Sequence, residues 1–321
     1  MKGAYYTKQY RNVFAECGHS QEEIDKKLKD AFHTVFYGPA GEKFYFEAGD
    51  DMGYFEDTGN FDARTEGMSY AMMMCVQMNM KEEFDRVWKW ARTYMYMEDG
   101  YNKGYFAWSC KTTGEKNDYG PAPDGEEFFA MSLFFASHRW GDGEGIFNYS
   151  QEAKNILSAC IHNGEKEPGD PIMEPENYLI RFIPSRKFSD PSYHCAHFYE
   201  LFGEWANEED RDFWKKAAKA SREYLKKACH PETGLAAEYA YPYEKEQDVF
   251  GGRHDWYYSD SYRVIANIGL DYEWFAADEW NVENNNKVQK FFMETHRGED
   301  FKVYEIDGTV IDQPALHPVA I

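Results

Sequence analysis

Hydrophobic residues recur along the chain with a helical period, and they predict two kinds of helix. The first kind is amphipathic: its apolar residues form one stripe, and charged residues occupy the other side. A helix with this pattern lies at a surface, with the stripe against the core. We predict such outer helices at residues 20–36, 81–97, 150–162 and 208–228.

The second kind of helix carries almost no charge after its first turn and is apolar on every side. A helix of this kind must be enclosed by its neighbours. We predict four such inner helices, at residues 66–78, 128–140, 191–202 and 261–272.

Inner and outer helices alternate along the chain, and a further helix at residues 278–295 brings the predicted number to nine. We interpret this all-α pattern as a barrel of helical hairpins, in which an inner ring of parallel helices is wrapped by an outer ring. A bundle or an α-solenoid would also alternate, but neither requires functional residues at the start of each inner helix. Strand signals are few, at residues 43–46 and 302–306, and predict short loop hairpins.

No linker-like stretch and no block of charge divides the 321 residues, so we expect one domain over residues 1–321. A closed barrel of six hairpins needs twelve helices. We therefore expect the chain to lack the C-terminal helices of such a barrel; an open barrel or a shorter variant is the alternative.

The inner helices begin with acidic or hydroxyl-bearing motifs at nearly even spacing. The reference residues Glu66, Asp124, Tyr193 and Asp260 follow one another at intervals of 58, 69 and 67 residues. Each interval matches the length of one helical hairpin with its loops. If the helices alternate up and down, the four starts lie at one end of the molecule. Paired carboxylates at such a rim indicate acid–base chemistry.

Composition excludes several classes of partner. A formal charge of −22 repels nucleic acid and anionic membranes, because the lysines are interleaved with glutamates and form no basic face. Aromatic residues make up 18% of the chain, which is enough for both a large core and a ring-lined cleft. We expect a neutral, hydroxyl-rich substrate, and no nucleic acid, membrane or obligate protein partner.

The N-terminal sequence Met1-Lys2-Gly3-Ala4 contains no apolar stretch of the signal-peptide kind, and no apolar run approaches the roughly 20 residues of a membrane span. The six cysteines are scattered, without Cys-x-x-Cys spacing. These features predict a cytoplasmic protein.

Glu66 is the first candidate catalytic residue. It begins an apolar helix, where partial desolvation favours the protonated form that a general acid needs. The helix N-terminus and the neighbouring Arg64 favour the anion instead. The alternative is an ordinary acid at a helix start, balanced by Arg64, and the residues alone leave both readings open.

Asp124 and Asp260 are the other candidate carboxylates, and each has the simpler alternative of an N-cap for the following helix. Arg263 stands one turn after Asp260, where it can orient that carboxylate. Tyr193 follows Asp190-Pro191, a strong helix-start signal, and is predicted to point to the same rim.

Two further motifs concern binding. Trp108 precedes a loop, which suits a flat ring on which a sugar face stacks, with a buried core position as the alternative. His194 and His197 have a His-x-x-His spacing, one residue short of the zinc-peptidase motif and without its glutamate, so we interpret them as core or rim residues. We expect no metal and no cofactor.

Six motifs, in this order, together resemble glycoside hydrolase family 8. They are Asp62-Ala63-Arg64-Thr65-Glu66-Gly67-Met68-Ser69-Tyr70, Tyr105-Phe106-Ala107-Trp108, Ala122-Pro123-Asp124-Gly125-Glu126, His138-Arg139-Trp140-Gly141-Asp142-Gly143, Asp190-Pro191-Ser192-Tyr193-His194 and Asp260-Ser261-Tyr262-Arg263-Val264. The similarity runs from the first residues to the last. It implies an (α/α)6 barrel and an inverting hydrolase that releases xylose from the reducing end of β-1,4-xylooligosaccharides.

The resemblance also implies a role for each candidate residue. Glu66 would be the general acid, and Asp260 the general base that activates water. Asp124 would bind the sugar at the cleavage site, Tyr193 would help to hold the water, and Arg263 would position the base. Inversion needs room for that water, so the acid and base carboxyl groups should stand roughly 6.5–9.5 Å apart.

The C-terminal motif Leu316-His317-Pro318 resembles a family loop that closes the cleft next to the released sugar. In the resemblance, His317 binds the sugar, and the loop lets only one xylose extend past the scissile bond. An endo-β-1,4-xylanase, which would lack this wall, is the alternative within the family. A non-catalytic carbohydrate-binding barrel is the alternative outside enzymes, although it would not need all three carboxylates.

Overall fold

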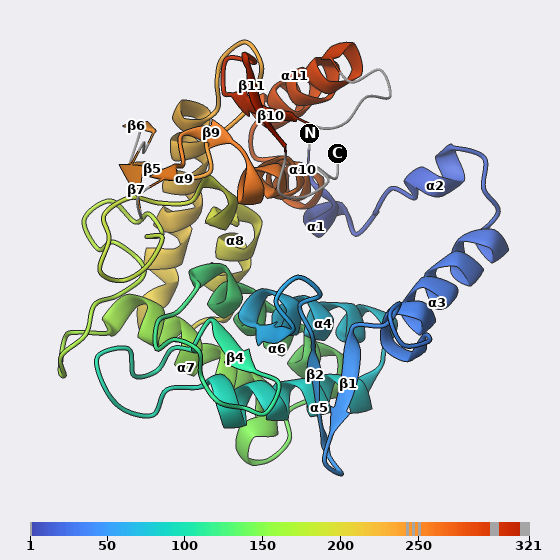
Figure 1. Ribbon diagram of the computed structural model, residues 1–321, viewed down its shortest axis with the longest axis vertical. Helices are drawn as coiled ribbons and strands as arrows, with labels where there is room; N and C mark the ends of the chain where they lie inside the picture. Colours follow the sequence, from blue (N-terminus) through green and yellow to red (C-terminus); the bar gives the residue numbers. More distant parts are fainter. Residues whose placement is uncertain (1, 242–243, 246–247, 250–251, 296–301, 315–321) are drawn as a thin grey trace. The chain divides into compact units, whose positions relative to one another are not determined.

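The computed structural model describes residues 2–241, 244–245, 248–249, 252–295 and 302–314, which form two compact units (Figure 1). The N-terminal unit is Tyr10–Asp170, and the C-terminal unit combines Met1–Gln9 with Pro171–Ile321. Each unit is built around helices, with only short strands between them. Among the helices of the described ranges, none has the length and apolarity needed to cross a bilayer.

The N-terminal unit contains two inner–outer helix hairpins, preceded by helices at its N-terminus. Its helices are α2 (Val13–Glu16), α3 (Gln21–Tyr37), α4 (Thr65–Met78), α5 (Lys81–Trp90), the π-helical turn η1 (Ala91–Met95), α6 (Pro123–Trp140), the 3-10 turn η2 (Gly145–Phe147) and α7 (Tyr149–His162). Its strands are β1 (Tyr45–Ala48), β2 (Met52–Phe55), β3 (Asp62–Arg64) and β4 (Ser109–Lys111).

The C-terminal unit repeats the hairpin arrangement. Its helices are α1 (Ala4–Thr7), α8 (Ala196–Trp205), α9 (Arg211–Ala228), α10 (Val264–Phe275) and α11 (Trp280–Thr295), with 3-10 turns η3 (Pro191–Tyr193), η4 (Glu208–Asp210) and η5 (Ser259–Arg263). Its strands are β5 (Ala240–Tyr241), β6 (Glu244–Lys245), β7 (Asp248–Val249), β8 (Gly252–Arg253), β9 (Trp256–Tyr257), β10 (Lys302–Glu305) and β11 (Val310–Pro314).

Helices pack in the same way in both units. In the N-terminal unit α4 packs against α5, α6 against α7, and the two inner helices α4 and α6 against each other. In the C-terminal unit α8 packs against α9, α10 against α11, and α8 against α10. The predicted alternation of inner and outer helices is therefore confirmed within each unit.

The predicted helices all form, and the described ranges contain nine helices of ten or more residues. Four starts differ from the prediction by three residues or more. Helix α6 begins at Pro123, earlier than predicted, because proline is preorganised for the first helical position. Helices α8, α9 and α10 begin later than predicted, at Ala196, Arg211 and Val264, because 3-10 turns precede them.

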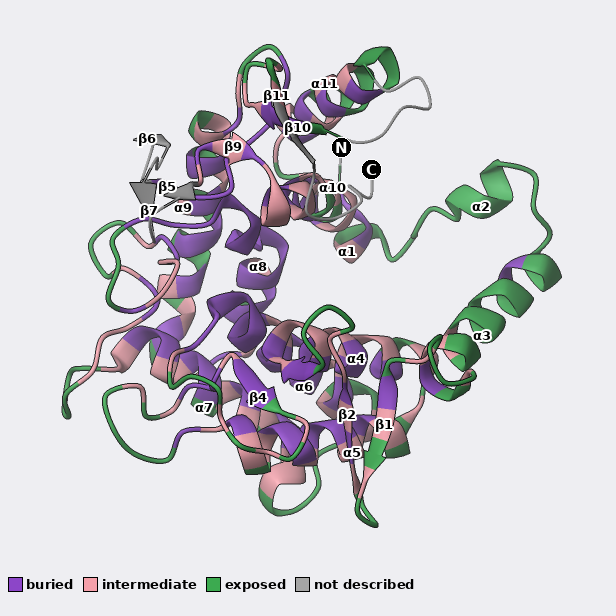
Figure 2. Cartoon of the chain, in the orientation of Figure 1, coloured by how far each residue is buried: buried purple, intermediate pink, exposed green. Residues whose placement is uncertain are grey.

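The inner helices differ in how completely their side chains are buried (Figure 2). Helices α6 and α8 are buried along most of their length, as their apolar sequences predict. The prediction is wrong for α10, on which Leu270 is 40% exposed. Apolar composition does not determine how many neighbours a helix has, and within the described residues one face of α10 is only partly covered.

The strands connect helices rather than form a layer. β1 and β2 make an antiparallel hairpin with Tyr45 opposite Phe55, and β10 pairs with both β9 and β11. The predicted loop hairpins near residues 43–46 and 302–306 are thus confirmed. β3 pairs with β4, which ties the residues before α4 to the segment after Trp108.

A buried ion-pair network joins the four long helices of the C-terminal unit. Arg222 of α9 donates two hydrogen bonds to Asp271 of α10, at 2.9 and 2.7 Å, and one to Glu200 of α8, at 2.6 Å. Asn281 of α11 donates to Asp271 at 2.9 Å. Because Asp271 is only 2% exposed, its charge depends on these partners.

We predict that Arg222→Ala destabilises the protein by about 3–5 kcal/mol, because it leaves the Asp271 carboxylate buried without its cation. Urea unfolding measures the change. The control is Lys216→Ala, which removes a solvent-exposed ion pair with Asp212 and should leave the unfolding midpoint unchanged. A loss below about 1 kcal/mol in Arg222→Ala would contradict the prediction.

Candidate functional site

The predicted site residues lie in both units. The N-terminal unit carries Glu66, Trp108 and Asp124, and the C-terminal unit carries Tyr193, Asp260 and Arg263. His317 lies outside the described residues. The expected separation between the Glu66 and Asp260 carboxyl groups stays a prediction.

Glu66 is the second residue of α4, directly after β3. Antiparallel pairing places Arg64 opposite Ser109 of β4. The backbone N–H of Thr65 donates to the carbonyl of Trp108 at 3.0 Å, so the start of α4 is attached to the segment that holds the tryptophan. Thr65 and Trp108, which are far apart in the sequence, therefore lie side by side.

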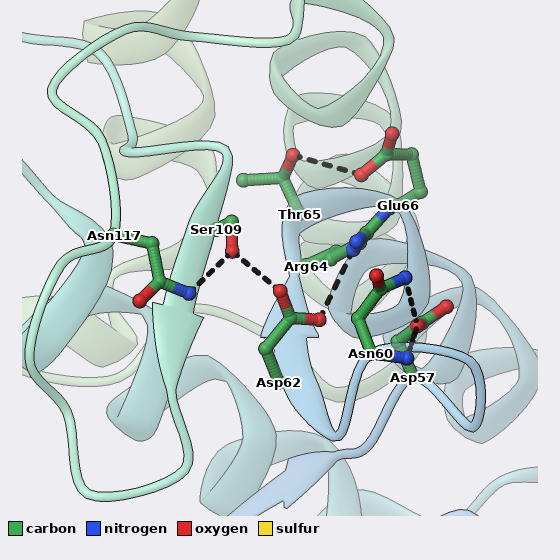
Figure 3. Close-up of polar contacts among 8 residues, drawn as sticks. All are labelled: Asp57, Asn60, Asp62, Arg64, Thr65, Glu66, Ser109 and Asn117. Carbon is green, nitrogen blue, oxygen red and sulfur yellow. Dashed lines mark hydrogen bonds and ion pairs between the residues drawn. The ribbon is translucent and has the colours of Figure 1, made fainter.

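The charge of Arg64 is engaged by Asp62 (Figure 3). Arg64 Nε donates to Asp62 Oδ1 at 3.0 Å, and the Ser109 hydroxyl donates to Asp62 Oδ2 at 2.7 Å. The Glu66 carboxylate instead points to the Thr65 hydroxyl, which donates to Oε2 at 3.4 Å. Arg64 is therefore engaged by a carboxylate other than Glu66, and the role of Glu66 stays a prediction.

Trp108 has a half-buried ring, so the alternative of a core tryptophan is wrong. Its indole Nε1 donates to Asp118 Oδ2 at 3.2 Å, and the Arg64 guanidinium lies 5.0 Å from the ring centroid. These two contacts fix the plane of the ring while part of its surface stays accessible. Such a surface suits stacking against an apolar sugar face.

Asp124 lies inside the first turn of α6, where it is 2% exposed. The N-cap of this helix is Ala122, so the N-cap alternative for Asp124 is wrong. The helix extends further toward the N-terminus than the pattern predicted, since Pro123 occupies its first turn. A carboxyl group in this position combines burial with the positive end of the helix dipole.

The starts of α4 and α6 approach each other at Gly125. A β-carbon at Gly125 would lie 2.5 Å from the β-carbon of Thr65, which is too close for two carbon atoms. Because Gly125 follows Asp124 and Thr65 precedes Glu66, this contact determines how near the two helix starts can come. Glycine is required here for close approach.

Glu126 is a buried carboxyl group that the sequence reasoning did not single out. It is fully buried, and Phe106 N–H donates to its Oε1 at 2.8 Å. Burial, with smaller contributions from the negative charges of Asp124 and Glu66, raises the pKa of Glu126 to about 8. The sequence signal that could have identified Glu126 is its place in the first turn of an apolar helix.

In the C-terminal unit, the turn η5 brings together three predicted residues. Arg263 Nη2 lies 3.0 Å from Asp260 Oδ1, and its guanidinium lies 5.8 Å from the ring centroid of Tyr193. Asp260 stands inside the 3-10 turn, whose N-cap is Tyr258, so the N-cap alternative for Asp260 is wrong. Tyr193 is buried, and its ring lies under the guanidinium that pairs with Asp260.

Two buried carboxyl groups accompany Asp260, and the sequence reasoning assigned a role to neither. Burial raises the pKa of Asp190 well above its usual range, and the negative charge of Asp260 adds to the effect while Arg263 opposes it. Burial also raises the pKa of Glu238 to about 8, again with a contribution from Asp260. Asp260, with 34% of its side chain exposed, is the member of the group that solvent reaches.

His194 and His197 are core residues, as predicted. His194 lies 2.9 Å from the hydroxyls of both Ser189 and Ser221, and burial lowers its pKa to about 3. Burial lowers the pKa of His197 to about 4. No group of three or more histidine, cysteine or acidic side chains is arranged to hold a metal ion in the part of the chain that the structure describes.

Known proteins resemble this chain over its whole length. Residues 51–308 match the sequence profile of Glycosyl hydrolases family 8. A reducing end xylose-releasing exo-oligoxylanase of Halalkalibacterium halodurans is 58% identical over 321 residues, which are 100% of this chain and 82% of that protein.

Solved structures agree with the sequence matches. Rex8A from Paenibacillus barcinonensis, complexed with xylose, superimposes with a TM-score of 0.96 at 52% identity, over 99% of this chain and 84% of that chain. A mutant of Rex8A, complexed with an arabinofuranosyl-xylotetraose, matches with the same TM-score of 0.96, the same 52% identity and the same coverage of 99% and 84%.

We predict that Gly125→Ala destabilises the protein by about 1–3 kcal/mol, because the new methyl group forces α4 and α6 apart. Gly67→Ala is the matched control, since it also adds a methyl group in a helix but meets only an ordinary contact, 3.8 Å from Phe55 Cβ. Helix propensity should make that control neutral or more stable. Equal urea midpoints for the two variants would contradict the prediction.

The pKa of Glu126 predicts a pH-dependent stability. Folding raises this pKa from 4.5 to about 8, so the folded protein holds the proton more tightly. The corresponding stabilisation is complete below the unfolded pKa and is lost as pH rises toward the folded pKa. Urea unfolding should therefore show Glu126→Gln gaining stability relative to the unmodified protein between about pH 5 and about pH 8. A stability difference that does not change with pH would contradict this assignment.

Proposed function

We propose that this chain, which belongs to glycosyl hydrolase family 8, releases xylose from the reducing end of β-1,4-linked xylooligosaccharides with inversion. The observation that carries the proposal is its 58% identity, over its full length, to a reducing end xylose-releasing exo-oligoxylanase. The bound xylose in the Rex8A structure supports the same class of sugar for this chain.

The family and the fold class predicted from the sequence are confirmed. The family profile and the structures with TM-scores of 0.94–0.96 assign the helical (α/α)6 fold to this chain. One domain over residues 1–321 stays a prediction. It is supported by the family match over residues 51–308, which runs through both units.

Glu66 is the general acid in the proposed mechanism. It protonates the oxygen of the leaving sugar as the glycosidic bond breaks. Its place beside the buried carboxyl groups of Asp124 and Glu126 supports this role, because a negatively charged neighbour opposes loss of the proton from a carboxyl group. Asp124 binds the hydroxyls of the sugar at the cleavage site, and Trp108 offers a face on which a sugar stacks.

Asp260 is the general base, which removes a proton from the attacking water. The Arg263 guanidinium, 3.0 Å away, pairs with Asp260 and fixes its orientation. Tyr193 lies under the same guanidinium and helps to hold the water. The partly exposed side chain of Asp260 leaves room for that water.

His317 accounts for release of a single sugar in this proposal. As in the family loop that Leu316-His317-Pro318 resembles, it binds the xylose beyond the scissile bond and closes the cleft. We also propose a cytoplasmic location, which is supported by the six cysteines, all of them free thiols and five of them buried.

We predict that Glu66→Gln and Asp260→Asn each reduce turnover of xylotriose by about 10²–10⁴-fold, because each removes one proton transfer. The control is Glu82→Gln, which changes an exposed carboxylate on α5 and should turn over as the unmodified enzyme does. Unchanged turnover in either site variant would refute the role given to that residue.

Proton NMR of the first-formed product tests the stereochemistry. If the enzyme inverts, cleavage of a β-linkage first gives the α-anomer at the new reducing end. A β-anomer there as the initial product would exclude inversion. In the same reaction with longer oligomers, xylose should be the first small product. A mixture of internal fragments would favour the endo-xylanase alternative.

A further inference from the structure

Glu126 is a buried carboxyl group to which the proposed mechanism gives no step of its own. It lies in the first turn of α6, and its Oε1 accepts a hydrogen bond from the backbone N–H of Phe106 at 2.8 Å. Phe106 stands two residues before Trp108, the proposed stacking surface. The hydrogen bond therefore joins α6 to the segment that carries the tryptophan.

The Phe106 N–H lies where the strand pairing of its own segment does not use it. Phe106 and Tyr96 form an antiparallel bridge, and the backbone hydrogen bonds of this bridge are made by the residues on either side of them, at 2.9 and 2.8 Å. The Phe106 N–H therefore points away from the strand of Tyr96. Because Phe106 is fully buried, its N–H needs an acceptor from the protein, and Glu126 provides one.

Trp108 is also attached to the start of α4. Thr65 N–H donates to the Trp108 carbonyl at 3.0 Å, and Gly125, directly before Glu126, lies against the Thr65 side chain. The starts of α4 and α6 and the segment that carries the tryptophan thus contact one another in pairs. Glu126 makes the contact between α6 and that segment.

The hydrogen bond of Glu126 differs from that of the indole ring in its exposure. The contact between the Trp108 ring and Asp118 is exposed, so water competes for both groups. The contact between Glu126 and Phe106 is buried, and an N–H that loses its acceptor there has no water to replace it. The backbone position of the tryptophan therefore depends more on Glu126 than on the contact with Asp118.

We propose that Glu126 is a positioning residue for Trp108, which acts through the backbone N–H of Phe106 to hold the stacking surface at a fixed place beside the starts of α4 and α6. This role rests on the proposed stacking of a sugar on Trp108. Without the acceptor, the segment shifts until the Phe106 N–H finds another one, and the ring moves with it.

The test compares two neutral variants of nearly the same length. Glu126→Gln keeps a side-chain oxygen that accepts from Phe106, whereas Glu126→Met offers only a weakly accepting sulfur. Both remove the charge of Glu126, so a difference between them does not come from its electrostatic effect on Glu66. With xylotriose, Glu126→Met should raise KM about tenfold with kcat within about threefold, because stacking contributes equally to the ground state and the transition state. Glu126→Gln should keep KM within about twofold of the unmodified value.

The separation of KM from kcat distinguishes positioning from a general loss of folded enzyme. A smaller folded fraction lowers kcat and leaves KM unchanged. Glu126→Asp keeps the carboxyl group but shortens the side chain, which withdraws the acceptor from Phe106. It should raise KM as Glu126→Met does, and it takes the place of Glu126→Met if that variant does not fold.

A double-mutant cycle shows whether Glu126 acts through the tryptophan. Trp108→Ala should itself raise KM about tenfold or more. In the Trp108→Ala background, Glu126→Met should have no further effect on KM, since both residues contribute to one stacking surface.

The outcomes separate this role of Glu126 from the proposed function. Unchanged KM in Trp108→Ala overturns the stacking role of the tryptophan, and the role of Glu126 with it. If Trp108→Ala raises KM, then a KM within about twofold of the unmodified value in Glu126→Met, or in Glu126→Asp in its place, overturns the role of Glu126 alone. Equal KM values in Glu126→Gln and Glu126→Met also overturn it, as do increases in KM that multiply in the double variant.

Discussion

Burial of carboxyl groups beside a more accessible carboxyl group is the physical constraint on which the candidate site depends. In the N-terminal unit, Asp124 and Glu126 are buried beside Glu66, and in the C-terminal unit Asp190 and Glu238 are buried beside Asp260. Ionising a buried carboxyl group costs free energy, and an ionised neighbour increases that cost. These surroundings therefore raise the pKa of Glu126, Asp190 and Glu238.

The two units reach similar chemistry with different backbones. Glu66 and Asp124 occupy the first turns of α-helices, where helix packing through Gly125 and Thr65 sets their spacing. Asp260 instead occupies a 3-10 turn, in which Ser259 has a left-handed backbone conformation. The proposed acid and the proposed base therefore have different surroundings.

The helices could be predicted because their pattern is local. The periodicity of apolar residues gave every long helix, and the motif order gave the family. The first residues of the helices were predicted less accurately. Proline makes α6 begin earlier than predicted, and 3-10 turns make α8 and α10 begin later. An N-cap and a residue one turn inside a helix have the same sequence signature. Only the backbone showed that Asp124 and Asp260 are not caps.

By itself, the sequence determined the alternation of helices and the family, and it offered candidates for a catalytic pair, because periodicity and motif order are properties of the chain. Tertiary structure alone decided that Arg64 is engaged by Asp62, that the Trp108 ring keeps an accessible face, and that Glu126, Asp190 and Glu238 are buried. Burial and pairing arise from segments that are distant in sequence. No local pattern reports which segment will remove a carboxyl group from water.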